Sequence, residues 1–357
     1  MMKATNIRLA FGMILAGLLI SACSGGLGPK PTEKEIFIDP NEGTTEEAST
    51  PISTPTLRPA STNTPEPPAG PTQAATPTNT LNPYDTLIFE GVQLRIGEQF
   101  DAAIAKFTEA IQTDPTNPQA YIERGITNSN TDKLDEAIAD INFAINYDPA
   151  SAQAYNARGV VWARKEQFEQ AIKDYNKAIE LQPDFPKAYS NRAIAYMLQS
   201  QFEEGIADFS KVVELTPDNP EAYFNRGQAY ITAMNQQLNE TYTELCIADF
   251  TQVLAFQPED PESLFSRGLC QSLKGNFVRS MEDYSAAIGF DPERANYYLF
   301  RALLYPDIGT QEQALADAQK VLDLSQDPDM RQAAEQILRE VPLTPTPTPG
   351  ATPTPLA

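Results

Sequence analysis

The sequence has no histidine, one tryptophan and three cysteines in 357 residues. Without histidine, the chain cannot carry a Ser-His-Asp or Cys-His catalytic system, an HExxH zinc site or a histidine-ligated haem. Three cysteines are too few for a disulfide-rich scaffold or a four-thiolate metal site. We therefore expect no catalytic residues, no metal site and no cofactor.

Basic residues are also scarce, since 26 Lys and Arg stand against 48 Asp and Glu, which gives a formal net charge of −22. Affinity for nucleic acid comes largely from Lys and Arg that neutralise phosphates, so the charge argues against a nucleic-acid partner. Residues 84–341 hold 41 of the acids and 21 of the bases. A domain with this charge is repelled by anionic lipid headgroups, and neutral or basic proteins are its expected partners.

The first 23 residues have the pattern of an export signal. Lys3 and Arg8 precede an apolar or glycine run from Leu9 to Ile20, which is too short to span a bilayer. The run ends in Ile20-Ser21-Ala22-Cys23, which resembles the lipobox of bacterial lipoproteins. The resemblance implies that the signal peptide 1–22 is removed and that Cys23 is lipidated. The protein would then be anchored outside the cytoplasm, at the outer leaflet of the cell membrane or at an outer membrane. The alternative is an ordinary secretory peptide with a chance cysteine.

Proline is abundant, but most of it lies at the two ends of the chain. Pro, Thr and Ser make up 28 of the 60 residues in 24–83, where Phe37 is the only aromatic residue. Such a segment cannot bury enough apolar surface to fold, so we expect 23–83 to be a disordered tether that follows the lipidated cysteine. In 342–357, 11 of 16 residues are Pro or Thr, which predicts a disordered tail.

Between these ends, a pattern recurs about every 34 residues, as at Pro115, Pro149, Pro183 and Pro217. A fixed period of this length predicts an internal repeat array. The motif Tyr121-x-x-Arg124-Gly125 has equivalents at Arg158, Arg192, Arg226, Arg267 and Arg301, and an aspartate follows each of them at Asp140, Asp174, Asp208, Asp249, Asp283 and Asp317. Apolar residues recur at spacings of three and four, which indicates amphipathic helices. A proline after the second helix of each unit is expected to end that helix, and Pro328 is counted with this set.

The pattern resembles the tetratricopeptide repeat (TPR), a 34-residue helix-turn-helix unit. The small and bulky signature positions of the family match Gly125, Trp162, Ala137, Ile141, Ala144 and Pro149. The resemblance implies an all-α fold, a right-handed α-solenoid of about seven TPR hairpins flanked by the disordered Pro/Thr-rich segments. The expected domain is 84–341, with repeats at 84–117, 118–151, 152–185, 186–219, 220–260, 261–294 and 295–328 and a capping helix at 329–341.

The recurring arginine and aspartate predict an ion pair within each repeat. The first repeat has Glu90 and Lys106 at these two positions, which exchanges both signs. If each arginine paired with the aspartate of the preceding repeat, Arg124 would face Lys106. Pairing within the repeat keeps every pair opposite in sign, so we expect Arg192 to contact Asp208 rather than Asp174.

The fifth repeat contains two further features. Its seven extra residues lie in Met234–Leu245 and predict a longer helix or loop, which is either a binding element or a neutral extension. Cys246 and Cys270 stand on facing helices at positions where small residues pack. Buried cysteine is an ordinary small apolar residue, so the sequence favours two buried thiols over a disulfide, although export would permit the bond.

In TPR proteins, the first helix of each repeat lines the inner face, which accepts peptides or partner proteins. Transferred position by position, this face consists of Ile122, Ile126, Asn156, Val160, Arg164, Lys187, Ile194, Phe224, Gln228, Phe265 and Leu269. The basic residues with which some relatives hold a C-terminal carboxylate are not matched. The mixture of aliphatic, aromatic and polar groups suits an extended apolar peptide or a helix.

Together, these patterns predict a non-catalytic, lipid-anchored TPR scaffold or adaptor that mediates protein–protein interactions in the cell envelope. We expect a monomer that contacts the membrane through its N-terminal lipid. One alternative is a cell-surface protein that captures peptide or glycan. A less favoured alternative is a regulator of an envelope hydrolase.

Overall fold

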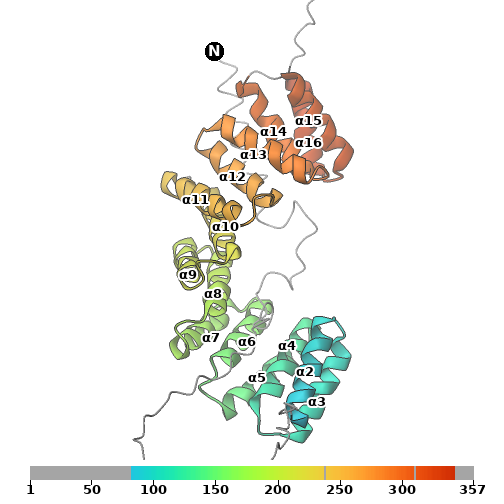
Figure 1. Cartoon of the computed structure of the whole chain (residues 1–357), viewed down its shortest axis with the longest axis vertical. Helices are drawn as coiled ribbons and strands as arrows, with labels where there is room; N and C mark the ends of the chain where they lie inside the picture. Colours follow the sequence, from blue (N-terminus) through green and yellow to red (C-terminus); the bar gives the residue numbers. More distant parts are fainter. Residues whose placement is uncertain (1–81, 237–238, 309–310, 342–357) are drawn as a thin grey trace, which may run out of the picture. The chain divides into compact units, whose positions relative to one another are not determined.

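The structure is a computed structural model that describes residues 82–236, 239–308 and 311–341 (Figure 1). The predicted signal peptide, Cys23, most of the tether and the Pro/Thr-rich tail lie outside these residues. Every regular element in the described ranges is a helix, and there are fifteen of them. The expectation of an all-α fold is therefore confirmed for this part of the chain.

The described residues form two compact units, 82–161 and 162–341. The first unit contains α2 (Pro83–Ile96), α3 (Phe100–Thr113), α4 (Pro118–Asn130), α5 (Leu134–Tyr147) and the first ten residues of α6 (Ala152–Arg164). The second contains the end of α6, then α7 (Phe168–Leu181), α8 (Pro186–Leu198), α9 (Phe202–Leu215), α10 (Pro220–Gln236), α11 (Glu240–Phe256), α12 (Pro261–Leu273), α13 (Phe277–Phe290), α14 (Ala295–Ile308), α15 (Gln311–Leu324) and α16 (Pro328–Glu340). Two helices fall in each expected repeat range, with two differences in bounds: α2 begins at Pro83, which was assigned to the tether, and α16 begins at Pro328, which was assigned to the seventh repeat.

Prolines begin helices as well as follow them. Pro118 and Pro261 are the first residues of α4 and α12, where the side chains of Asn117 and Asp260 accept hydrogen bonds from backbone N–H groups. Proline suits this position because the first helical N–H has no partner within the helix. Pro328 occupies the same position in α16, so its assignment to the prolines that end second helices is wrong.

Short turns fold successive helices into antiparallel hairpins. Three residues separate the two helices of most repeats, and the middle residue adopts a left-handed conformation at Glu98, Asp132, Glu166, Ser200 and Gly275. The two helices then approach closely at a small residue of the first helix. A Cβ atom on Gly125 would lie 2.7 Å from Cγ1 of Ile141, and one on Gly268 would lie 2.7 Å from Cε1 of Tyr284. Glycine at these positions is therefore required by packing.

The seven extra residues of the fifth repeat lengthen its two helices. Both α10 and α11 have 17 residues, whereas α8 has 13 and α9 has 14. The extra residues are thus four in α10 and three in α11, about one helical turn each. Three residues still separate the helices. Met234, which is equivalent to the left-handed Ser200, lies within α10 because that helix continues.

Cys246 in α11 and Cys270 in α12 form a disulfide that joins the fifth repeat to the sixth. The preference for two free thiols is therefore wrong. Their Cα atoms are 6.2 Å apart, within the range that a disulfide spans without movement of the backbone. Both side chains are fully buried, as the sequence predicted. Burial was the reason to expect free thiols, but a disulfide can be buried equally well. Sequence position alone could not supply the separation of the two helices.

Each unit has its own apolar core. In the second unit, one continuous cluster runs from Ala193 in α8 to Ile337 in α16. The last helix buries Met330, Ala333, Ala334 and Ile337 against this cluster and turns a polar face outward. Such a face is what a terminal helix of a repeat array needs, because no further repeat covers it.

Candidate protein-binding surface

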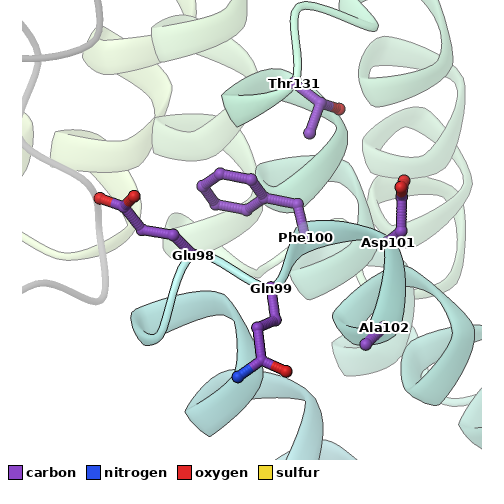
Figure 2. Close-up of a pocket in the computed structure, with 6 residues that line it drawn as sticks. All are labelled: Glu98, Gln99, Phe100, Asp101, Ala102 and Thr131. Atoms are coloured by element: carbon purple, nitrogen blue, oxygen red, sulfur yellow. The ribbon is translucent and has the colours of Figure 1, made fainter.

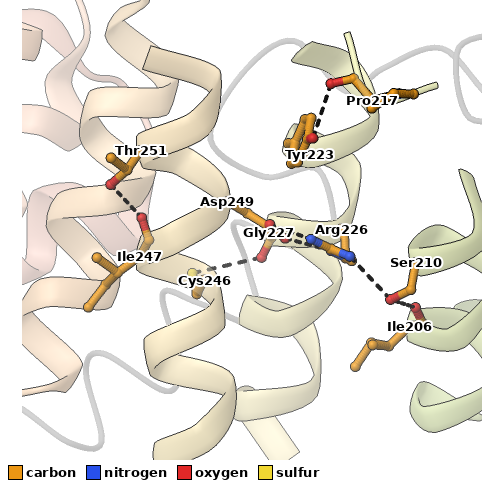
Figure 3. Close-up of polar contacts among 10 residues, drawn as sticks. All are labelled: Ile206, Ser210, Pro217, Tyr223, Arg226, Gly227, Cys246, Ile247, Asp249 and Thr251. Atoms are coloured by element: carbon orange, nitrogen blue, oxygen red, sulfur yellow. Dashed lines mark hydrogen bonds and ion pairs between the residues drawn. The ribbon is translucent and has the colours of Figure 1, made fainter. Parts of the chain in front are cut away.

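Arginines on the first helices bind aspartates on the second helices of the same repeats. In α10, Arg226 donates through Nε and Nη2 to the two carboxylate oxygens of Asp249, at 2.8 and 2.7 Å (Figure 3). The same bidentate geometry joins Arg124 to Asp140, Arg192 to Asp208, Arg267 to Asp283 and Arg301 to Asp317. The exchanged pair Glu90 and Lys106 is also in contact, at 2.7 Å. Pairing within the repeat is therefore confirmed in these six repeats, and Arg192 contacts Asp208 as expected.

The arginines make a further contact that the sequence patterns did not reveal. Nη1 of Arg124 donates to Oγ1 of Thr108 at 3.1 Å, and Nη1 of Arg301 donates to Oγ of Ser285, also at 3.1 Å. Arg158, Arg192 and Arg226 make the equivalent contacts with Asn142, Asn176 and Ser210. Each acceptor belongs to the preceding repeat. It lies two residues after the aspartate of that repeat or, in the first repeat, two residues after Lys106. These arginines therefore hold successive repeats in register and are structural.

Five of the eleven residues predicted to line the inner face are buried: Ile122, Ile126, Asn156, Phe265 and Leu269. Phe265 makes ring contacts with Tyr284, Tyr297 and Phe300, with centroids 5.0 to 5.5 Å apart. Leu269 belongs to the same apolar cluster. Ile122 and Ile126 belong to a core cluster of the first unit. Their side chains support the hairpins from inside and leave little area for a partner.

The other six predicted residues are partly exposed: Val160, Arg164, Lys187, Ile194, Phe224 and Gln228. The last four lie on α8 and α10 of the second unit, and we call them the first-helix surface. The Phe224 ring stands edge-on to Phe250 at 5.6 Å. Nε2 of Gln228 donates to Oγ of Ser266 at 3.2 Å. Internal contacts thus hold these side chains in place while part of each remains accessible.

A shallow cleft of about 360 Å³ lies at the hairpin turns of the first two repeats (Figure 2). It is lined by Glu98, Gln99, Phe100, Asp101, Ala102 and Thr131. None of the predicted inner-face residues contributes to it. The cleft offers two carboxylates and one ring without a lysine or arginine on its lining, so it does not resemble a site for an anion.

Within residues 82–236, 239–308 and 311–341, no three His, Cys, Asp or Glu side chains gather closely enough to hold a metal ion. In the same part of the chain, the helices are too short or too polar to pass through a bilayer.

Comparisons with known proteins identify the architecture. Residues 162–200 and 195–232 match the family model described as TPR repeat. The C-terminal part of a TPR repeat-containing protein from Cytophaga hutchinsonii is similar in structure, with a TM-score of 0.56, 16% identity and coverage of 69% of this chain and 98% of that chain. PilW, described as a widely conserved type IV pilus biogenesis factor, gives a TM-score of 0.51 and 17% identity over 60% of this chain and 96% of its own.

No curated protein matches the sequence. The similarity to solved structures is at the level of the fold. It confirms the predicted all-α TPR solenoid, a fold that is typical of scaffolds that bind protein or peptide partners.

Proposed function

We propose that this chain is a non-catalytic, lipid-anchored adaptor that holds protein partners outside the cytoplasm, at the surface of a membrane. The observation that carries the proposal is the first-helix surface. Lys187, Ile194, Phe224 and Gln228 are partly exposed on two successive first helices, α8 and α10. Ile194 and Gln228 occupy equivalent positions, 34 residues apart. A surface with this spacing suits an extended segment that runs across successive repeats.

The chemistry of the surface favours a protein partner. Phe224 offers an aromatic face, Ile194 an aliphatic one and Gln228 an amide. Aromatic anchors surrounded by polar groups are typical of protein interfaces. The acidic composition of the chain favours basic or neutral partners, and it slows association with anionic lipid.

Two features support the location outside the cytoplasm. The apolar run that ends in Ile20-Ser21-Ala22-Cys23 supplies the lipidation signal. The Cys246–Cys270 disulfide is a bond that persists mainly in oxidising compartments. Buried acyl chains contribute about 0.8 kcal/mol per CH₂ group, so two or three chains on Cys23 would make the attachment effectively permanent.

Membrane fractionation tests the anchor. We expect the wild-type protein in the membrane fraction with a lipid on Cys23. The Cys23→Ser variant should carry no covalent lipid, whether its signal peptide remains attached or the protein is released from the membrane. Mass spectrometry of the N-terminal peptide distinguishes a diacylated or triacylated cysteine from an unmodified one. An unmodified Cys23 in the mature protein would overturn the anchor and leave the adaptor role to be judged separately.

Affinity purification from detergent-solubilised membranes tests the adaptor role. We expect a protein partner to be recovered in fixed ratio with the wild type and to be lost at least ten-fold with Ile194→Glu. The matched control is Ala248→Glu, which adds the same charge at an exposed position of the second helix α11. Equal recovery with both variants would contradict binding at the first-helix surface. Recovery of only peptide or sugar would favour the capture role instead.

A further inference from the structure

The outward face of α2 is apolar, although no described repeat precedes it. Phe89 is 57% exposed and Ile96 is 63% exposed. Val92, which is partly exposed, lies between them at helical spacing, so the three side chains share one face of the helix. Together they form an uncovered apolar surface at the N-terminal end of the first unit.

Comparison with later repeats shows that the Phe89 position is normally covered. In five of the six later repeats, the residue equivalent to Phe89 is at most 3% exposed: Glu123, Ala157, Asn191, Ser266 and Phe300. Asn225 in the fifth repeat is partly exposed. The equivalent of Ile96 in α8, Leu198, is 50% exposed although a repeat precedes it, so the comparison concerns Phe89 rather than Ile96. The equivalent position therefore lies at a contact between hairpins. In the first unit, Glu123 shows this directly, because its carboxylate lies 3.6 Å from Arg95 of α2. Phe89 thus occupies a position that a preceding hairpin covers in most later repeats, but in the first unit no described hairpin covers it.

The two ends of the array differ in this respect. The C-terminal helix α16 ends the array with a polar outward face, and it contributes none of the exposed large apolar residues of the described ranges. Terminal repeats need polar outer faces to stay soluble, so α2 departs from the rule and requires a cover.

The N-terminal tether contains one segment with the chemistry of such a cover. Ile36-Phe37-Ile38 is the only run of three large apolar residues in 24–81, and Asp39-Pro40 follows it. The resulting pattern Ile-x-x-Asp-Pro also occurs at 111–115, 145–149 and 288–292. In each of those places it spans the end of a second helix, namely α3, α5 and α13. There the isoleucine packs against the apolar core.

We propose that residues 36–40 fold back onto α2 and cover Phe89 on its outward face. The connecting segment 41–82 has 42 residues. A flexible chain of that length has a mean end-to-end distance of about 36 Å, which is ample to return to the start of α2. Because docking is intramolecular, the effective concentration is in the millimolar range, so the tether outcompetes a second copy of the chain at ordinary protein concentrations.

Docking has two consequences. It shortens the free part of the tether to the residues before Ile36, which brings the folded domain closer to Cys23. It also removes a surface through which two chains could associate. Glu35 and Asp39 flank the run, and Asp85 lies one turn before Phe89 on α2, so repulsion between these carboxylates makes docking stronger at higher salt.

Amide hydrogen exchange of the full chain in detergent tests the proposal. We expect the amides of residues 86–96 to exchange about ten-fold faster in the double variant Ile36→Asp/Phe37→Asp than in the wild type, a change that corresponds to about 1.4 kcal/mol. The control is Ile52→Asp/Leu57→Asp, which places the same charges at isolated apolar residues of the same tether and should leave the rates unchanged. Phe89→Asp changes an exposed residue of α2. In this background, Ile36→Asp/Phe37→Asp should no longer change the exchange rates of residues 86–96.

Equal exchange rates in the wild type and both tether variants would overturn the proposal. Protection of α2 that rises with protein concentration and ignores the tether variants would identify a second copy as the occupant, and the proposal would fail. Protection of α2 that appears only when envelope extract is added would identify another protein as the occupant, and the proposal would also fail.

Discussion

At the scale of single residues, the arginines of the first helices carry the most structural information. Each bidentate pair fixes a hairpin, and the third donor of most of them reaches an acceptor in the preceding repeat. The sequence predicted the first contact because the exchanged Glu90 and Lys106 left only one arrangement without like charges in contact. It did not reveal the second contact, since Thr, Asn and Ser at one position look like ordinary surface variation until the helices are placed.

Replacement of Arg226 by methionine should destabilise the second unit. The change leaves the Asp249 carboxylate, which is 5% exposed, without its bidentate partner. An uncompensated buried charge is costly, and because Arg226 is itself partly exposed we expect a loss of about 2 kcal/mol. Denaturant unfolding followed by circular dichroism measures the loss. Arg294→Met is the control, because Arg294 is exposed and pairs with Asp291 on the surface, so its change should stay within about 0.5 kcal/mol.

If Arg226→Met and Arg294→Met had equal effects, the structural role of the bidentate pairs would be contradicted. The double variant Arg226→Met/Asp249→Leu provides a further check. Removing both charges should recover most of the stability, because no buried carboxylate remains unpaired.

Buried tyrosines make the fold sensitive to alkali. Burial raises the pKa of Tyr175, Tyr284 and Tyr297 above the ordinary value, and raises that of Tyr230 as well. Above about pH 10, the unfolded chain releases these protons and the native chain retains them, so stability falls as pH rises. We expect tyrosine ionisation, followed by ultraviolet absorbance, to show a late step that coincides with loss of helical circular dichroism. Ionisation of every tyrosine near pH 10 with the helices intact would contradict this burial.

At the scale of helices and hairpins, close packing at a small residue, glycine or alanine, decides how near the two helices of a repeat approach. Gly268 and Gly289 belong to the two helices of the sixth repeat but have opposite surroundings. A Cβ atom on Gly268 would meet the Tyr284 ring at 2.7 Å, whereas a Cβ atom on Gly289 would meet nothing within 4 Å.

The two glycines therefore predict opposite responses to alanine. Gly268→Ala should destabilise the protein by about 1 to 3 kcal/mol, because the helices must separate or the ring must move. Gly289→Ala should stabilise it by about 0.5 to 1 kcal/mol, because alanine favours a helix and fits without contact. Thermal unfolding of the two variants measures the shifts. A shift of the same sign in both would contradict the packing described here.

The disulfide joins α11, the second helix of the lengthened hairpin, to α12. It closes a loop with a sequence separation of 24, for which chain entropy predicts a stabilisation of about 3 kcal/mol. In the Cys23→Ser background, alkylation without reductant should add no mass. Reduction should then lower the unfolding transition, and Cys246→Ala/Cys270→Ala should make the protein insensitive to reductant. Addition of two alkyl groups before reduction would contradict the bond.

At the scale of the whole molecule, the sequence predicted the architecture well because a 34-residue period repeats the same packing problem. Gly125, Ala137 and their equivalents recur at positions that only a hairpin brings together. The binding residues were harder to predict, since position within a repeat does not determine exposure. Phe224 and Phe265 occupy equivalent places in the pattern, yet Phe265 is buried among Tyr284, Tyr297 and Phe300, while Phe224 is partly exposed.

The central claim is that the first-helix surface of α8 and α10 contacts a protein partner. Site-specific photo-crosslinking in intact cells tests it most directly. The account predicts that a photoreactive side chain at position 224 yields a defined covalent product with another protein. The same group at position 252, an exposed residue of the second helix α11, should yield none. Equal crosslinking at both positions, or none at position 224 while the partner still co-purifies, would contradict the claim.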